Sequence, residues 1–331
     1  MGTQLQRSQS QSSSPSITPL ITVTGALALA GVGLAFIAWS RRNVMHNMPM
    51  TAALDGDLKS FKSRAGQLAY YSNGPTKRGA TPLVFIHSIN AAASSYEMKP
   101  LYDHYARERR VYALDLPGYG FSERSDRAYS PELMQTAITE FIEHELRGGP
   151  VDVVAISLSS EFVALAAQAA PKLFRSLTFI SPTGMSMKDT ANRRSDGVYK
   201  FLRTPLWGRP LYDLLTSRPS MRYFLQGSQK RPVNSGLVNY AYITSHQPDA
   251  EWVPFHFLAG KLWTRTIFDV YSALPQPCLL VYGQDRFIRY DLSDELRTKP
   301  NWKVISLENA GALAHWDDLN SVVRYVDKMI G

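Results

Sequence analysis

Residues 153–160 constrain the fold of this 331-residue chain more than any other stretch. An apolar, β-branched run leads into Ser157, and an alanine-rich run follows at once over residues 162–170. This pattern predicts a strand, a sharp turn and a helix, with the serine hydroxyl lifted above the sheet at the turn. Such a turn has little room beside the serine, and the small residues Ala155 and Ser159 flank it. Ser157 is therefore a candidate nucleophile, although a serine at a helix start is also a common N-cap.

Four further apolar runs have the length of buried strands, and each ends in a polar turn or loop. The first ends at His87, and the second ends at Asp115 before a loop rich in Gly and Pro. The third ends in a loop that carries Asp285, and the fourth precedes a segment that carries His315. The runs span residues 82–86, 111–116, 277–282 and 302–307.

These features resemble the α/β-hydrolase superfamily, because five of its motifs occur in the family's order. They are the His87 turn, the loop 115–122, the Ser157 turn, the loop 283–287 and the terminal His315. The resemblance covers roughly four-fifths of the chain. It implies an α/β fold with a mostly parallel, doubly wound sheet and a helical cap inserted after the sixth strand.

The resemblance and the composition together divide the chain into segments. We expect a disordered tail at 1–16, a transmembrane helix at 17–39, a linker at 40–64, a catalytic core at 65–182 and 274–331, and a helical cap at 183–273.

The resemblance also gives a role to each candidate residue. Ser157 would attack a carbonyl carbon, His315 would take the proton of the serine, and Asp285 would orient His315. The backbone N–H groups of Leu158 and Ile89 would bind the oxyanion that forms. Because the turn carries a serine and not an aspartate, the pattern argues against epoxide hydrolysis and dehalogenation.

The other predicted site residues are His87 and Ser88, which we expect beside the substrate pocket. His87 would serve there by packing and hydrogen bonding, and not as a proton carrier. Ser88 stands where the family usually has glycine, and Ala312 stands where most relatives have the catalytic histidine. Asp285 could also be a turn residue that pairs with a neighbouring arginine.

Two functions from different classes follow. The first is a serine hydrolase, in the class of carboxylesterases and lipases, that cleaves a small-molecule or lipid-like apolar acyl ester. The alternative is a catalytically degenerate α/β-hydrolase that binds a small molecule or acts as a scaffold, and Ala312 and Ser88 are the residues that favour it.

Residues 17–39 carry no charge over 23 positions, enough as a helix to cross a bilayer. Trp39 and then Arg41 and Arg42 follow, which predicts a single-pass anchor with the catalytic domain on the cytoplasmic side. A cleaved signal peptide would have a more basic start and a shorter apolar core. A buried core helix would normally carry charge on one face.

The formal charge of +8 is concentrated between Ser186 and Gly236, which hold ten basic and three acidic residues. No nucleic-acid-binding motif accompanies this stretch, so an anionic lipid surface is the better partner. A solvated face of the cap is the plainer interpretation.

The single cysteine, Cys278, excludes an internal disulfide. The sequence has no zinc-type Cys/His spacing and no Gly-rich phosphate loop, so it predicts no metal and no cofactor.

Overall fold

The computed structural model describes residues 33–77, 79–187, 195–285 and 288–331. The predicted tail at 1–16 and most of the predicted membrane span at 17–39 lie outside these residues. Residues 33–43 are helical. No helix in these ranges is both long and apolar enough to cross a membrane.

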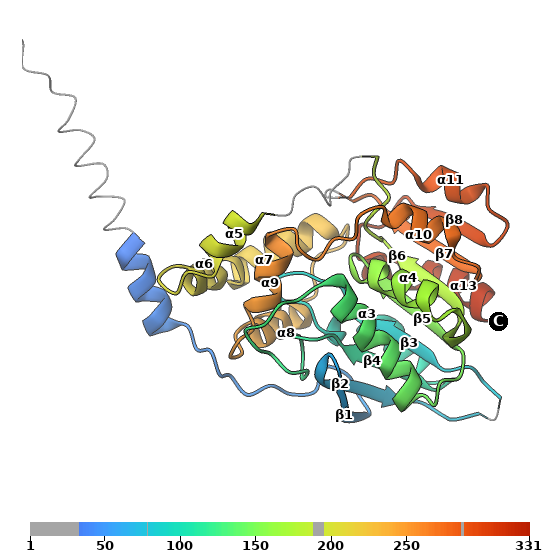
Figure 1. Ribbon diagram of the computed structural model, residues 1–331, viewed down its shortest axis with the longest axis horizontal. Helices are drawn as coiled ribbons and strands as arrows, with labels where there is room; N and C mark the ends of the chain where they lie inside the picture. Colours follow the sequence, from blue (N-terminus) through green and yellow to red (C-terminus); the bar gives the residue numbers. More distant parts are fainter. Residues whose placement is uncertain (1–32, 78, 188–194, 286–287) are drawn as a thin grey trace, which may run out of the picture. The chain divides into compact units, whose positions relative to one another are not determined.

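The chain divides into two compact units, Met1–Val44 and Met45–Gly331. The second unit holds one eight-stranded sheet in the order β1-β2-β4-β3-β5-β6-β7-β8 (Figure 1). The pairs β1–β2 and β2–β4 are antiparallel and the others are parallel, which confirms the mostly parallel sheet. The strands are β1 Asp57–Ser63, β2 Gly66–Asn73, β3 Leu83–Ile86, β4 Val111–Asp115, β5 Val151–Ile156, β6 Phe174–Ile180, β7 Cys278–Gly283 and β8 Trp302–Leu307.

The central strands form because both of their faces are covered. Every residue of β3 and β5 is buried, and such strands read as continuous apolar runs in a sequence. Val153 and Ala155 belong to the core on one face, and Val154 and Ile156 belong to the core on the other. The first core takes side chains from α3 (Pro131–Glu140), α4 (Ser159–Ala169) and α10 (Ile267–Ala273), and the second from α2 (Lys99–Tyr105), α12 (Ala314–Asp317) and α13 (Leu319–Ile330).

Short helices also lie in connections outside residues 183–273. They are η1 Ser95–Met98, η2 Phe141–Glu145, η3 Pro171–Leu173 and α11 Ser293–Arg297.

The predicted linker at 40–64 is corrected by the structure, because the sheet begins inside it with β1. Only Phe61 and Ser63 of this strand are buried. β1 is an edge strand that pairs with β2 alone, and its exposed residues are polar or charged except for Leu58. An edge strand of this kind has no apolar run, which is why the sequence pattern missed it.

Residues 183–273, which we call the insertion, lie between β6 and β7. They contain small cores of their own, one around Tyr212 and Phe255 and another around Met221 and Val238. Besides α10, the insertion has α5 Asp196–Leu202, α6 Gly208–Leu215, α7 Arg218–Ser228, α8 Ser235–Ser245 and α9 Trp252–Leu258.

Candidate functional site

Ser157 lies in the turn between β5 and α4, at the carboxyl edge of the parallel strands. Its φ of 56° is in the left-handed region, which a residue with a Cβ rarely occupies. The turn is held by its backbone, because Ser157 N–H donates to the carbonyl of Ile180 at 2.9 Å. The side chain is partly exposed. Conformational strain of this kind costs on the order of 1–3 kcal/mol and is concentrated at functional turns.

Two buried backbone N–H groups lie in neighbouring turns at the same edge. Leu158 follows Ser157, and Ile89 follows β3, which pairs with β5 through Ile86 and Ala155. Leu158 is 1 % exposed and Ile89 is 2 % exposed, and neither N–H donates a hydrogen bond to a described residue. Buried N–H groups without a partner are rare, so each of these two donors is available to an acceptor that the described residues do not supply.

The loop that carries Ile89 is held by Glu97 of η1. One carboxylate oxygen of Glu97 accepts from Ser88 N–H at 2.9 Å, and the other accepts from Asn90 Nδ2 at 2.7 Å. Tyr119 Oη donates to the carbonyl of Asn90 at 2.8 Å. The sequence analysis missed Glu97, because nothing in the local sequence distinguishes it from any other helical glutamate.

His87 is buried and both of its ring nitrogens have partners. Nδ1 lies 2.7 Å from the carbonyl of Ser88, and Nε2 lies 3.0 Å from the N–H of Leu116. A carbonyl can only accept and an N–H can only donate, so Nδ1 carries the proton of a neutral ring. In this arrangement His87 ties the end of β3 to the loop after β4.

His315 is fully buried on α12 and is tied to Glu97. Its Nε2 donates to the carbonyl of Glu97 at 2.7 Å, and Trp316 Nε1 donates to the same oxygen at 2.7 Å. Burial lowers the pKa of His315 to about 4, so the ring is neutral at pH 7. Among the described residues, its Nδ1 has no hydrogen-bond partner and no hydrogen bond joins His315 to Ser157.

Asp285 lies two residues beyond the end of β7. Residues 286–287, which follow it, are not among the residues that the structure describes. It is close enough to Tyr290 that its charge adds to burial in raising the pKa of that phenol. The neighbouring Arg289 Nε lies 3.4 Å from Asp291 Oδ1. The structure thus places Ser157, Leu158 and Ile89 in turns that follow two paired strands, β5 and β3, and it joins His315 to Glu97.

A family model described as the alpha/beta hydrolase family matches residues 83–324. The chain belongs to the α/β-hydrolase family. No curated protein sequence matches this α/β-hydrolase.

Solved structures with different named activities share its fold. A membrane phospholipase A, described as a bacterial virulence factor, has a TM-score of 0.64 and 16% identity, over 95% of this chain and 96% of its own. An esterase from Thermogutta terrifontis has a TM-score of 0.61 and 16% identity, over 82% of this chain and 97% of its own. A haloalkane dehalogenase variant from Bradyrhizobium elkanii has a TM-score of 0.64 and 20% identity, over 83% of this chain and 96% of its own. At these identities the likeness shows the fold alone.

This α/β-hydrolase also holds a buried carboxyl group, Glu161, one helical turn beyond Ser157. The side chain joins α4 to both ends of the insertion, because it accepts from Thr183 Oγ1 and, at 2.8 Å, from Thr264 N–H. Burial raises the pKa of Glu161 to about 7, although these two hydrogen bonds oppose the shift. Sequence reasoning missed Glu161, since its partners lie 22 and 103 residues away.

We expect Glu161→Gln to change how stability depends on pH. Between pH 4.5 and 7 the folded carboxyl keeps a proton that the unfolded chain loses, so the free energy of unfolding falls as pH rises. The fall is at most about 3 kcal/mol, and glutamine removes it. The variant should match the wild type near pH 5 and exceed it near pH 8 in urea unfolding followed by tryptophan fluorescence. Glu132→Gln, at an exposed position of α3, is the control. Parallel wild-type and Glu161→Gln curves would contradict the prediction.

Proposed function

We propose that this α/β-hydrolase is a membrane-anchored serine hydrolase that cleaves an apolar acyl ester through an acyl-enzyme at Ser157. The observation that carries the proposal is that the buried N–H groups of Leu158 and Ile89, at the edge of the sheet where Ser157 makes its strained turn, donate to no described residue. Preorganised donors of this kind stabilise the negative charge that develops on the carbonyl oxygen in acyl transfer. A serine that only caps a helix accepts from N–H groups of its own helix and does not require them.

In the proposed reaction Ser157 Oγ attacks the carbonyl carbon of the ester and its proton passes to His315. The carbonyl oxygen becomes an oxyanion and accepts hydrogen bonds from Leu158 and Ile89. His315 then returns the proton to the leaving alkoxide, which departs as an alcohol. Water, deprotonated by the same ring, cleaves the acyl-enzyme and restores Ser157, and Asp285 orients the ring throughout.

This mechanism requires His315 to change its hydrogen-bond partner. Its Nε2 donates to the carbonyl of Glu97 and so carries the hydrogen of the neutral ring. To accept the proton of Ser157, the ring has to change to the Nδ1–H tautomer, and α12 or the ring has to move so that Nε2 leaves Glu97 when substrate binds. Catalytic hydrogen bonds are often absent or long in a free enzyme and form in the substrate complex.

The aromatic residues of the insertion and the predicted anchor at 17–39 favour an apolar, lipid-like acyl group as substrate. The two arginines after the span, Arg41 and Arg42, favour a catalytic domain on the cytoplasmic side. No cofactor is needed for this chemistry.

The test is hydrolysis of p-nitrophenyl esters by the full chain in detergent micelles. We expect activity, with kcat/KM higher for a long acyl chain than for acetate, since more apolar surface leaves water. The wild-type activity has to vanish in Ser157→Ala, which separates enzyme from background hydrolysis. A preference for acetate would contradict the lipid-like substrate, and no activity on any ester would contradict the hydrolase.

A second function is favoured by the engagement of His315 with Glu97 and by Ala312 at the family's usual base position. It is the binding of an acyl compound without turnover. Calorimetry with a long-chain ester separates the two, because a binder gives stoichiometric heat and leaves the ester intact, whereas the hydrolase consumes it.

A further inference from the structure

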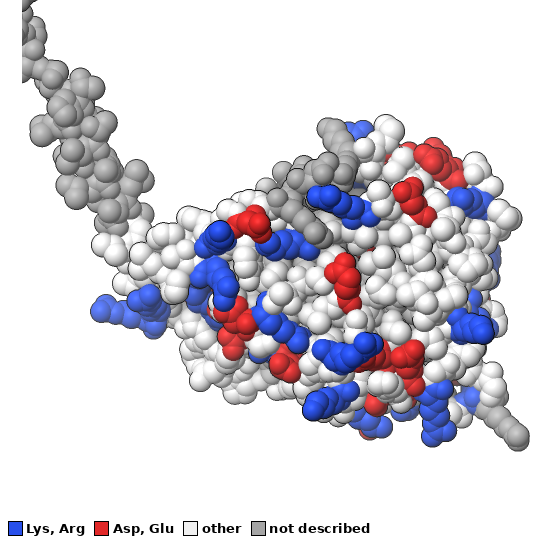
Figure 2. All heavy atoms as spheres, viewed as in Figure 1, with Lys and Arg blue, Asp and Glu red and all other residues white. Residues whose placement is uncertain are grey.

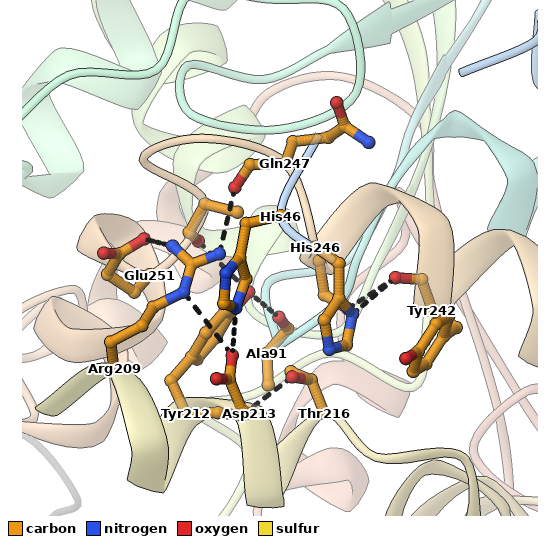
Figure 3. Close-up of polar contacts among 12 residues, drawn as sticks. His46, Ala91, Arg209, Tyr212, Asp213, Thr216, Tyr242, His246, Gln247 and Glu251 are labelled. Carbon is orange, nitrogen blue, oxygen red and sulfur yellow. Dashed lines mark hydrogen bonds and ion pairs between the residues drawn. The ribbon is translucent and has the colours of Figure 1, made fainter. Parts of the chain in front are cut away.

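The globular unit begins with an extended segment, residues 45–51, which we call the strap. The strap has no helix or strand of its own, yet it is fastened to the insertion (Figure 3). Among the described residues, three hydrogen bonds join it to the insertion: His46 Nε2 with Asp213 Oδ1 at 2.9 Å, Gln247 Nε2 with the carbonyl of Met48 at 2.9 Å, and Tyr240 Oη with the carbonyl of Thr51 at 3.0 Å.

The carboxylate that His46 contacts, Asp213, is itself held in place by a second residue. Asp213 is 1 % exposed on α6, and Arg209 Nε lies 3.4 Å from its Oδ1. Arg209 also pairs with Glu251, so Asp213 is held between the arginine and His46 (Figure 3). A buried carboxylate needs such partners, and the strap supplies one of them.

A row of stacked groups joins the strap to α7. His46 stacks on His246 at 6.1 Å between ring centroids, and His246 stacks on Tyr242 at 4.1 Å. The guanidinium of Arg218, the first residue of α7, lies 3.7 Å from the centroid of Tyr242. The start of α7 is therefore a close neighbour of the strap.

α7 exposes both aromatic and basic side chains. Met221 is its only buried residue, whereas Tyr223 is 59 % exposed and Phe224 is 44 % exposed. Arg218 and Arg222 are exposed on the same helix, one turn apart. A short helix with these side chains has the composition of one that lies in a membrane interface.

The loop after α7 extends the basic surface with Lys230 and Arg231, both exposed. Arg218, Arg222 and Arg231 form no ion pair with a described carboxylate. Figure 2 shows one face of the molecule, where Lys and Arg side chains lie next to Asp and Glu side chains at several places. Elsewhere in the insertion Arg203 does pair with a carboxylate, that of Asp126. A groove of about 530 Å³ lies next to this surface and is lined by Arg222, Tyr223, Gln226, Gly227 and Val233.

We propose that α7 and the loop after it dock on the anionic lipid surface of the membrane that holds the anchor. The inference rests on the proposed anchor at 17–39, which ends six residues before the strap begins. Residues 40–43 are helical, with a rise of about 1.5 Å per residue, and two extended steps lead on to residue 45. The connection therefore reaches only about 13 Å, so an anchor at 17–39 keeps the start of the strap close to the bilayer. The arginines meet anionic headgroups, and Tyr223 and Phe224 enter the interface.

A second copy of the chain is the other candidate to cover α7. A symmetric contact through this helix would place its basic side chains near their own copies, and α7 itself carries no carboxylate to pair with them. Charge complementarity therefore favours the lipid surface.

The test uses the full chain in nanodiscs and a single reactive cysteine. Cys278 is fully buried and burial raises the pKa of its thiol, so it stays unlabelled. Tyr223→Cys carries an environment-sensitive fluorophore, and Lys172→Cys, exposed beside the amino end of β6, is the matched control. Lipids brominated in the acyl chain report which label reaches the bilayer.

We expect brominated lipid to quench the label at position 223 and not at 172, and to do so in phosphatidylglycerol discs more than in phosphatidylcholine discs. High salt and the double variant Arg218→Glu/Arg222→Glu should abolish that difference. Incorporation into discs with equal, weak quenching at both positions would overturn the docking alone. A chain that does not enter the discs overturns the anchor and this inference with it. Labelling at Ser157 is measured separately and is unaffected by either result.

Discussion

Replacement of Ser157 by alanine is expected to lower ester hydrolysis by about a thousandfold or more, to the rate of the uncatalysed background. No other hydroxyl can form the acyl-enzyme in the proposed mechanism, so the loss falls on kcat and not on substrate binding. The backbone strain at φ 56° is the same for alanine as for serine, so the free energy of unfolding should change little. Stopped assays of kcat and KM, with urea unfolding in parallel, measure both effects.

The matched control is Ser160→Ala, one residue inside α4. The Ser160 hydroxyl is buried and has no hydrogen-bond partner among the described residues, so its loss removes no contact. Both variants delete one buried or half-buried hydroxyl from the same turn of the chain. Equal activity of Ser157→Ala and the wild type, with Ser160→Ala also unchanged, would remove Ser157 from the chemistry.

Substitution of His315 should produce the second large effect, and two variants separate its two roles. His315→Gln keeps an N–H donor near Nε2 for the carbonyl of Glu97, but it cannot take a proton from Ser157. His315→Ala removes both functions. We expect both variants to lose about 10²–10⁴-fold in kcat, as for loss of a general base. Only His315→Ala should also lose stability, because it leaves the carbonyl of Glu97 with one donor fewer.

The opposite pattern would show that His315 is a structural residue. If His315→Gln hydrolyses esters as fast as the wild type, then the hydrogen bond to Glu97 is what matters and the base lies elsewhere. The loop 88–90 would then depend on His315 only through the carboxylate of Glu97.

The pH dependence of kcat/KM and of the free energy of unfolding also tests the role of His315. A base has to be neutral, and burial lowers the pKa of His315 to about 4. The acid limb of kcat/KM should therefore lie near pH 4 and not near 6.5. The free energy of unfolding should fall as pH drops from 6.5 to 4, because the unfolded chain binds a proton that the folded ring excludes. This slope has the opposite sign to that of Glu161.

The core of the fold could be predicted from the sequence because its physical cause is local. Strands buried on both faces read as continuous apolar runs, and the turn at Ser157 needs small neighbours, so both leave a signature over a few residues. β1 left none, since an edge strand that faces water is polar.

The connections around the site could not be predicted, because they join residues that are distant in sequence. His315 and Glu97 are 218 residues apart, and Glu161 and Thr264 are 103 apart. No local pattern encodes such a contact. The family resemblance supplied His315 as a base, and only the structure shows that its Nε2 is engaged with Glu97 in the free protein.

The most direct test of the central claim is covalent labelling of the full wild-type chain with a fluorophosphonate at neutral pH, read by mass spectrometry of the Ser157 peptide. An activated serine displaces fluoride and keeps the phosphonyl group on Oγ. We predict one adduct, on Ser157, formed quickly in the wild type and in Ser160→Ala, and not formed in His315→Gln. A folded wild-type chain that stays unlabelled would contradict the hydrolase and favour an α/β-hydrolase that binds its ligand without cleaving it.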